Sequence, residues 1–385
     1  MTRTRKSTYV PVIVLGGGTM GSAAAWALAR RGVQALVFEQ FDHVHTFGSH
    51  GGKTRVIRHA YAEGAEYVPL MLRADRLWQE LQALSGQEIL VRTGGLDLAT
   101  PGYTHAQSAR ASAEAHSLPH EMLGGEEVRR RWPQFTIGDE WQACYSPGAG
   151  FLRVEPALRA LAAQARSGGV TIQERCAVLA WGADDESAWV ESTSGTYHCD
   201  RLIVTAGAWT SGILAGLGLP LTVLRKILWW FLVDDRAAFS PERFPVFIAE
   251  SAGGEIYGLP ISDDPGLKLA AHSGGDAVNP DTVDRTAHAH ETDQVMPFAA
   301  TILNGVRQEP VDSAVCLYVM SPDSDFILDR HPRWSHVVLG AGFSGHGFKF
   351  APAIGEHLVE LALDPEQHAH ARFALDRLQV SPLSA

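Results

Sequence analysis

The feature that most constrains the fold is a cluster of glycines directly after a short apolar run. Residues 12–15 are apolar, and Gly16, Gly18 and Gly21 follow at the spacing G-x-G-x-x-G. The first glycine permits a tight turn, the second lets the backbone approach a pyrophosphate, and the third allows the next helix to pack closely. An Ala-rich helix is expected over residues 22–31, with its N-terminal dipole towards the phosphates. The pattern predicts a dinucleotide-binding unit.

An acidic residue stands where such a unit needs one. Glu39 closes the next apolar run, residues 35–38, and is placed to accept hydrogen bonds from an adenosine ribose. Strand, helix and acid together favour dinucleotide binding. The competing interpretation is a glycine-rich turn that only packs strand on helix, with Glu39 as a solvated strand end.

Length, charge and cysteine usage narrow the class of protein. A chain of 385 residues exceeds one ordinary core, so two domains are expected. The net charge of -11, without a basic block, argues against nucleic acid as a partner. No apolar stretch reaches the ~20 residues of a membrane span. The N-terminus has no small-residue cleavage site and the cysteines form no C-x-x-C pair, so a cytoplasmic protein with reduced thiols is predicted.

A second glycine-rich loop lies near the C-terminus. Residues 340–349 include Gly342, Gly345 and Gly347, and they separate an apolar run from a helix that begins near Pro352. Glycines this dense indicate that the backbone comes close to something flat or anionic. A helix N-terminus aimed at an isoalloxazine would stabilise the negative charge of a reduced flavin. The loop therefore favours a flavin over a nicotinamide, and a tight crossover without ligand is the alternative.

A dinucleotide fold that starts at the N-terminus, is interrupted and resumes at the C-terminus predicts an α/β protein with two interleaved domains. The expected Rossmann-type FAD-binding domain takes residues 1–86, 150–220 and 321–385. The expected mixed-sheet substrate domain takes residues 87–149 and 221–320, of which the second segment is rich in strand-forming and aromatic residues.

Two apolar runs after residue 254 predict a hairpin. Alternation places Lys268 and His272 on one face, and the turn brings Tyr257 to the neighbourhood of Ala271 on the partner strand. If that face points into a cavity, three chemically active side chains converge there. From the residues alone, a solvated face is the more common outcome.

Three motifs give a more specific indication. Residues 48–61 read GSHGGKTRVIRHAY, residues 314–318 read AVCLY, and residues 342–350 read GFSGHGFKF. In this order, and over essentially the whole chain, they resemble the monomeric sarcosine oxidase family. That family includes N-methyltryptophan oxidase and is related to pipecolate and fructosyl amino acid oxidases.

The resemblance implies FAD as the cofactor. In that family the flavin is attached through a thioether to a cysteine, and the matching residue is Cys316. By itself Cys316 would be interpreted as a small buried strand residue. Beyond the glycines and Glu39, the cofactor contacts that the resemblance implies are Ser49, Thr54, Arg55, Val178 and Lys349.

The resemblance also implies roles around the flavin ring. Lys268 would sit near flavin N5, where its charge assists the reaction with O2, and Arg55 would lie against the other face. Arg58 and Lys349 would hold the substrate carboxylate, which needs cationic partners in a low-dielectric pocket. From spacing alone, Arg55 and Arg58 favour an exposed helical pair. The other residues predicted around the substrate are Tyr257, His272 and Tyr318.

The chain departs from the family pattern at three places. Gly51 and Lys53 stand where the family usually has a second histidine and an acid, so attachment of the flavin is less certain. Ile248 replaces a methionine, and Trp229 with Trp230 replaces smaller residues. The pocket is therefore expected to differ in size, and sarcosine itself is not assured as the substrate.

The sequence thus predicts a flavoprotein oxidase that converts a secondary, N-substituted amino acid such as sarcosine to an imine, with O2 reduced to hydrogen peroxide. One alternative is an FAD-dependent dehydrogenase for a D-amino acid or proline-like substrate that passes electrons to a quinone or carrier. Another is a non-catalytic dinucleotide-binding module. A monomer is expected from family precedent. No metal is expected, because H-x-H pairs such as His43 and His45 lack further ligands at metal spacing.

Overall fold

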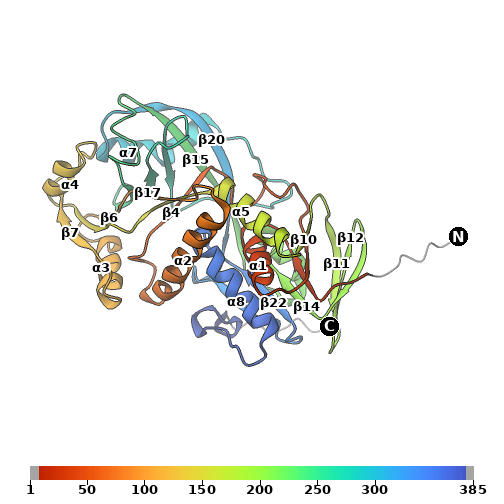
Figure 1. The fold of residues 1–385 in the computed structure, drawn as a ribbon. Coiled ribbons are helices and arrows are strands. Elements are labelled where there is room, and N and C mark those ends of the chain that lie inside the picture. The colour runs from red at the N-terminus through yellow and green to blue at the C-terminus, as the bar shows by residue number, and fades with distance from the viewer. Residues whose placement is uncertain (1–7, 379–385) are drawn as a thin grey trace.

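A computed structural model describes residues 8–378, and two large sheets dominate it (Figure 1). The first has six strands in the order β10-β3-β2-β14-β22-β21, and all neighbours are parallel except β21 and β22. Its strands are β2 (Val12–Leu15), β3 (Ala35–Phe38), β10 (Thr171–Gln173), β14 (Arg201–Val204), β21 (Ile327–Arg330) and β22 (Val337–Ala341). The central strands are apolar along almost their whole length because both faces of the sheet are covered.

Helices cover one face of this sheet and a small sheet covers the other. The helices are α1 (Thr19–Arg30), α2 (Val68–Ser85), α5 (Val154–Ser167) and α8 (Ala351–Leu363). The small sheet has the order β1-β13-β12-β11, from β1 (Thr8–Tyr9), β11 (Val178–Ala183), β12 (Ala188–Ser192) and β13 (Gly195–Cys199). Val14 packs into the core under the helices and Ile13 into the core under the small sheet. This part is therefore built in three layers.

The second large sheet is mixed. Its nine strands follow the order β19-β15-β18-β17-β16-β6-β8-β7, with β20 paired to β15. They are β6 (Gly95–Ala99), β7 (Glu121–Gly124), β8 (Gln142–Ser146), β15 (Thr222–Val233), β16 (Val246–Ser251), β17 (Gly254–Leu259), β18 (Leu267–Ala271), β19 (Asp276–Ala277) and β20 (Val306–Met320). A third sheet joins β4 (Thr54–Ile57), β9 (Gly150–Arg153) and β5 (Leu90–Arg92). The remaining helices are α3 (His105–Ala115), α4 (Gly125–Arg131), α6 (Thr210–Ile213) and α7 (Met296–Ile302).

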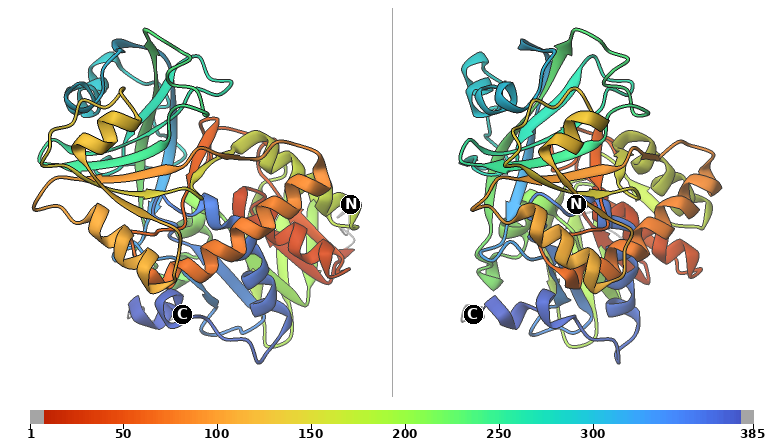
Figure 2. Two further views of the ribbon diagram at one scale, coloured as in Figure 1. Left: turned by 60° about the vertical axis from the view of Figure 1, so that its left-hand side comes forward. Right: turned by 90° about the vertical axis from the view of Figure 1, so that its left-hand side faces the viewer.

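Strand β20 brings the two large sheets together. It pairs with β15 in the mixed sheet, and near its end Val319 accepts a hydrogen bond from Ser344 N at 2.9 Å, in the loop after β22. Both views in Figure 2 show β20 running from the mixed sheet into the centre of the molecule. Cys316 and Tyr318 therefore lie at the junction of the two sheets.

The structure confirms the predicted α/β class and the main elements. Helix α2 ends before Gly86, whose φ of 65° is in the left-handed region that favours glycine. Helix α1 begins at Thr19, three residues before the expected start, because the glycine turn leads directly into it. The boundaries of the two domains stay a prediction. Among residues 8–378, no helix is long and apolar enough to cross a membrane.

Candidate active site

The first glycine cluster forms the turn between β2 and α1. Gly16 has a φ of 96°, and a Cβ there would lie 2.5 Å from the carbonyl oxygen of Thr205. A Cβ on Gly21 would lie 1.8 Å from the carbonyl oxygen of Gly16, so only glycine lets α1 approach the strand. At Gly18 the nearest atoms to a Cβ would be those of His50, 4.0 Å away. The backbone at Gly18 is thus open towards a ligand.

Glu39 lies at the end of β3 and faces the same turn. One carboxylate oxygen accepts a hydrogen bond from Gly17 N at 3.0 Å, and the other accepts one from Phe41 N at 2.9 Å. Burial raises the pKa of Glu39 to about 7, although the backbone donors favour the ionised form. The side chain is buried, so the interpretation as a solvated strand end is wrong.

A large pocket lies between the two glycine clusters. Backbone N–H groups at the start of α1, an acid and glycines at both ends suit an elongated dinucleotide, so these residues fit FAD. The predicted cofactor and substrate residues that line the pocket are Gly16, Gly18, Glu39, Ser49, Arg55, Val178, Tyr318, Gly342, Gly345 and Gly347. The predicted residues that do not line it are Gly21, Thr54, Arg58, Tyr257, Lys268, His272, Cys316 and Lys349.

Three predicted aromatic residues form one wall of the mixed sheet. Tyr257 in β17 pairs with Ala270 in β18, one residue from the expected neighbour Ala271. Because side chains alternate, this register puts Tyr257 on the same face as His272. The ring centroid of His272 lies 6.1 Å from that of Tyr257 and 6.3 Å from that of Tyr318. The structure therefore brings these three side chains together.

Lys268 and Arg55 are cations held by backbone carbonyls. Lys268 is 1% exposed, and its Nζ donates to the carbonyl oxygen of Thr54 at 2.7 Å. Arg55 donates to carbonyl oxygens of four residues, among them Ser49 at 3.0 Å and Gly52 at 2.9 Å. Burial, and then the charge of Arg55, lower the pKa of Lys268 well below its ordinary value. Within residues 8–378 neither cation is hydrogen-bonded to a carboxylate.

Arg55 belongs to strand β4, and Arg58 follows directly after that strand. The interpretation of the two arginines as an exposed helical pair is therefore wrong. Arg58 is 4% exposed, and its guanidinium lies 5.1 Å from the ring centroid of Tyr61. The Nζ of Lys349 lies 5.0 Å from the same centroid. The two cations predicted to hold a carboxylate thus both lie over the ring of Tyr61.

Their polar partners differ. Arg58 Nη1 donates to Asp97 Oδ1 at 2.7 Å, and Nη2 donates to both carboxylate oxygens of Glu63 at 2.8 and 2.9 Å. Lys349 Nζ donates to the carbonyl oxygen of His346 at 2.9 Å and to the Tyr61 hydroxyl at 3.2 Å. Burial lowers the pKa of Lys349 to about 7. Arg58 is therefore neutralised by protein carboxylates, and Lys349 is not.

Cys316 is fully buried in β20, directly opposite Lys226 of β15. Burial raises the pKa of the thiol, while Arg55, Lys268 and Lys226 favour the thiolate. Lys226 Nζ donates to three successive carbonyl oxygens, those of residues 272–274, at 3.2, 2.6 and 3.0 Å. This cation fixes the backbone directly after β18. Attachment of the flavin at Cys316 stays a prediction.

Of the residues that depart from the family pattern, Gly51 and Trp230 lie near the thiol, whereas Trp229 packs in the core on the other face of the sheet. A Cβ on Gly51 would lie 3.6 Å from the Cβ of Cys316. The Nζ of Lys53 lies 5.2 Å from the ring centroid of Trp230, and the Nζ of Lys268 lies 5.6 Å from it. Trp230 is 1% exposed, so a large ring fills this part of the protein.

Sequence reasoning missed the carboxylates around Arg58 and the lysine opposite the cysteine. Asp97 could have been found as an acid in the middle of the otherwise apolar run of residues 95–99. Lys226 stands similarly inside a long apolar strand. Glu63 carries no such signal, because it lies in a loop. In the part of the chain that the structure describes, no group of three or more His, Cys, Asp or Glu side chains is arranged to hold a metal ion.

Comparison with known proteins identifies the family of this chain. The family model described as FAD dependent oxidoreductase matches residues 11–361. The chain belongs to this family. The oxidoreductase is 38% identical to a monomeric sarcosine oxidase of Bacillus sp. (strain B-0618), over 96% of this chain and 97% of the relative. It is 36% identical to an N-methyl-L-tryptophan oxidase of Yersinia pestis (strain Pestoides F), over 96% of this chain and 99% of the relative.

Solved structures show the same fold at lower identity. NikD, described as an unusual amino acid oxidase essential for nikkomycin biosynthesis, superposes with a TM-score of 0.83 at 23% identity, covering 96% of this chain and 98% of the other. The family match and the two relatives at 38% and 36% identity confirm the resemblance to the sarcosine oxidase family and the dependence on FAD.

Proposed function

We propose that this oxidoreductase converts an N-substituted amino acid to an imine and reduces O2 to hydrogen peroxide. The names of its relatives support this reaction. The observation that carries it is the group of three cations beside Cys316, the half-buried Arg55 and the buried Lys268 and Lys226, whose hydrogen bonds go to backbone carbonyls. Burial lowers the pKa of both lysines, and negative charge that develops next to them favours their ammonium forms, which in turn stabilise that charge.

FAD, when bound, would take a hydride equivalent from the carbon next to the amine nitrogen, so that the substrate becomes an imine once nitrogen loses its proton, and would pass the two electrons with two protons to O2, which gives hydrogen peroxide. The protein contributes position and charge. The rings of Tyr257, His272 and Tyr318, which lie together on the mixed sheet, would shield the substrate from water. Lys349, whose hydrogen bonds go to the Tyr61 hydroxyl and the His346 carbonyl, would supply an ammonium to the substrate carboxylate. Lys268 supplies positive charge where O2 is reduced.

Covalent attachment of the flavin through Cys316 is part of the proposal. Burial raises the pKa of the Cys316 thiol, and the charges of three cations act against burial and favour the reactive thiolate form. Acid precipitation of the purified protein tests this point. A yellow precipitate that releases no flavin is expected. Complete release of flavin into the supernatant contradicts covalent attachment and leaves the oxidase proposal intact.

The reaction itself is tested by a peroxide-coupled screen in air with sarcosine, N-methyltryptophan, pipecolate and fructosyl amino acids. Peroxide formation with at least one secondary amine is expected. An amine that bleaches the flavin without peroxide, and transfers electrons only when a quinone is added, would favour the dehydrogenase instead.

We also propose a cytoplasmic monomer with the interleaved domain boundaries given above, to be tested by sedimentation and limited proteolysis.

A further inference from the structure

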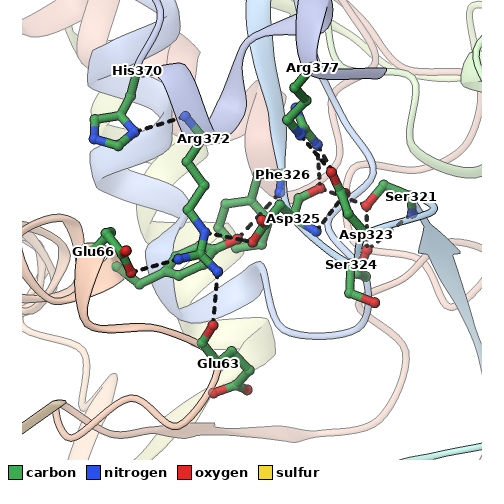
Figure 3. A network of polar contacts seen from close by, with 12 residues as sticks. Glu63, Glu66, Ser321, Asp323, Ser324, Asp325, Phe326, His370, Arg372 and Arg377 are labelled. Atoms are coloured by element: carbon green, nitrogen blue, oxygen red, sulfur yellow. Dashed lines mark hydrogen bonds and ion pairs between the residues drawn. The ribbon is translucent and has the colours of Figure 1, made fainter. Parts of the chain in front are cut away.

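Asp264 is the exception among the buried acids of this protein. The acids that are buried in residues 8–378 are Glu39, Asp75, Asp97, Asp264 and Glu291. All of them except Asp264 accept hydrogen bonds from backbone or side-chain donors. Asp264 is 4% exposed, and its Oδ1 has no hydrogen-bond partner among the described residues. Figure 3 shows the usual arrangement: Asp325 accepts a hydrogen bond from Arg372 at 2.9 Å, although it is less buried than Asp264.

Asp264 lines a cavity behind the loop that precedes β4. The cavity has a volume of about 280 Å³ and is bounded by residues 44–54, by the start of α5 and by the turn of residues 262–264. Three further polar atoms of its lining residues are buried without a hydrogen-bond partner in the described chain, namely His50 Nε2, Arg153 Nε and Ser262 Oγ. Buried polar atoms take water as a partner where the space allows it, so this cavity is suited to hold water.

Thr54 connects this cavity to Lys268. It lines the cavity, and its carbonyl oxygen accepts the hydrogen bond from Lys268 Nζ at 2.7 Å. Asp264 precedes Lys268 by four residues, in the turn before β18. The main-chain carbonyl of Asp264 accepts a hydrogen bond from Arg236 Nη2 at 3.0 Å, so the turn is held independently of the carboxylate. The carboxylate acts on the Lys268 ammonium through space, without a hydrogen bond between them.

Charges of both signs act on Lys268. The cations Arg55 and Lys53 lower the pKa of Lys268, whereas Asp264 and a Cys316 thiolate raise it. A cysteine joined to the flavin by a thioether carries no charge. Among these groups, Asp264 is then the one acid that works against burial and favours the ammonium form of Lys268.

Lys53 cancels only part of this effect. It is half exposed and divides its single charge between Asp264, at 3.5 Å, and Asp312, at 3.4 Å. Exposed ion pairs are also screened by solvent. Lys53 stands where the family usually has an acid, so in this chain the negative charge near Lys268 comes from the turn before β18 instead of from the loop.

We propose that Asp264 is a positioning residue that acts through Lys268: its buried carboxylate, at the edge of this cavity, holds Lys268 in the ammonium form. The inference rests on the proposed function, because that function uses the positive charge of Lys268 in the reaction with O2. Asp264 itself touches neither the substrate nor O2 in this role. Its contribution is electrostatic, and it involves no transfer of a proton or a bond.

The test is the pH at which Lys268 loses its proton in the FAD-loaded protein, measured by NMR with ¹³C-labelled lysine. The chain has only five lysines, so few signals are expected, and Lys268→Met identifies the one that belongs to Lys268. Asp264→Asn keeps the shape of the side chain and removes its charge. Asp263→Asn is the matched control, because Asp263 lines the same cavity but is exposed and paired with Arg153.

In Asp264→Asn the midpoint of the Lys268 titration is expected to fall by about one pH unit, because the ammonium loses the acid that favours it. Asp263→Asn should leave the midpoint unchanged. Asp264→Glu, which keeps the charge, should recover most of the fall. An unchanged or higher midpoint in Asp264→Asn, or an equal fall in Asp263→Asn, overturns the proposal.

Asp264→Ala provides a second variant if Asp264→Asn does not fold, since it also removes the charge. The same fall is expected, and its absence likewise overturns the proposal. The outcome is separable from the proposed function. A lowered Lys268 midpoint in a protein whose flavin no amine reduces would reject the oxidase and keep the inference. Peroxide formation with an unchanged midpoint would do the reverse.

Discussion

The cations of this protein fall into two regions that treat charge in opposite ways. Beside Cys316, the side chains of Arg55, Lys268 and Lys226 donate to backbone carbonyls. Beside Tyr61, Arg58 is bonded to the carboxylates of Asp97 and Glu63. Carbonyl oxygens satisfy the N–H donors without cancelling the charge, whereas carboxylates satisfy the donors and cancel the charge as well.

Because their partners differ, the two regions are suited to different tasks. Among the described residues, the cations beside Cys316 have no carboxylate hydrogen-bonded to them, and burial disfavours the charged form of the two lysines. Such an arrangement is tolerated where negative charge has to be stabilised. The region around Arg58 has no spare positive charge. Lys349 lies next to Arg58 but donates to a carbonyl and a hydroxyl. Like the cations beside Cys316, it therefore has no carboxylate among its hydrogen-bond partners in the described residues.

Lys268→Met is the substitution for which we expect the largest effect. Loss of this charge should slow the reaction of the reduced protein with O2 by about 10²–10³-fold, the cost of removing one preorganised electrostatic group. Reduction by substrate should change much less. Stopped-flow measurement of the two half-reactions separates the effects.

Lys53→Met is the matched control for that experiment, because Lys53 lies over the same Trp230 ring but is half exposed and paired with Asp264 and Asp312. Its two half-reactions should resemble those of the unchanged protein. Equal slowing of both half-reactions in Lys268→Met would remove Lys268 from the oxygen reaction.

Lys349→Met should weaken carboxylate recognition by about 10–100-fold, the value of a hydrogen bond to a charged group. The effect should appear in kcat/KM for an amino acid substrate and in the dissociation constant of propionate, measured from the perturbation of the visible flavin absorbance, but not in that of its neutral isostere propionamide. Lys349→Arg, which restores the charge, should recover part of the loss. A variant that lost propionate and propionamide binding equally would indicate a purely structural role.

The pH dependence of propionate binding gives a smaller effect with a definite sign. Burial lowers the pKa of Lys349 to about 7, with Glu63 acting to raise it and Arg58 to lower it. Lys349 is therefore charged below that pH and neutral above it. The dissociation constant should rise towards tenfold per pH unit above about pH 7. A flat profile between pH 6 and about pH 9 would show that another cation binds the carboxylate.

The smallest effect concerns stability. Lys226→Met leaves the carbonyl oxygens of residues 272–274 without their ammonium partner, so the free energy of unfolding should fall by about 1–3 kcal/mol. Urea denaturation of Lys226→Met and of the unchanged protein measures it. Equal stability of the two proteins would mean that the backbone after β18 does not depend on Lys226.

The dinucleotide turn and the main helices could be predicted because their signals are local. Neighbouring backbone atoms leave no room for a Cβ at Gly16 or Gly21, and Glu39 accepts a hydrogen bond from the same glycine turn. Helix α2 can be seen in the sequence from apolar residues at helical spacing, which end at Gly86.

The environment of Arg58 could not be predicted in the same way. Asp97 reaches Arg58 from a strand of the mixed sheet, 39 residues along the chain. Register between strands decides that contact, and register is a property of the folded sheet rather than of a local motif. The resemblance to the family implies that Arg58 is a cation near the site, which stays a prediction, and only the structure shows the acids bonded to it.

The central claim is that the glycine-lined pocket holds an FAD that a secondary amino acid reduces and O2 reoxidises. The most direct measurement is the visible absorbance of the purified protein without oxygen, before and after a secondary amino acid is added, and again after air is admitted. The account predicts a flavin spectrum that bleaches with the amine and returns in air with one peroxide per flavin. A colourless protein that takes up no added FAD, or a flavin that no amine bleaches, would contradict it.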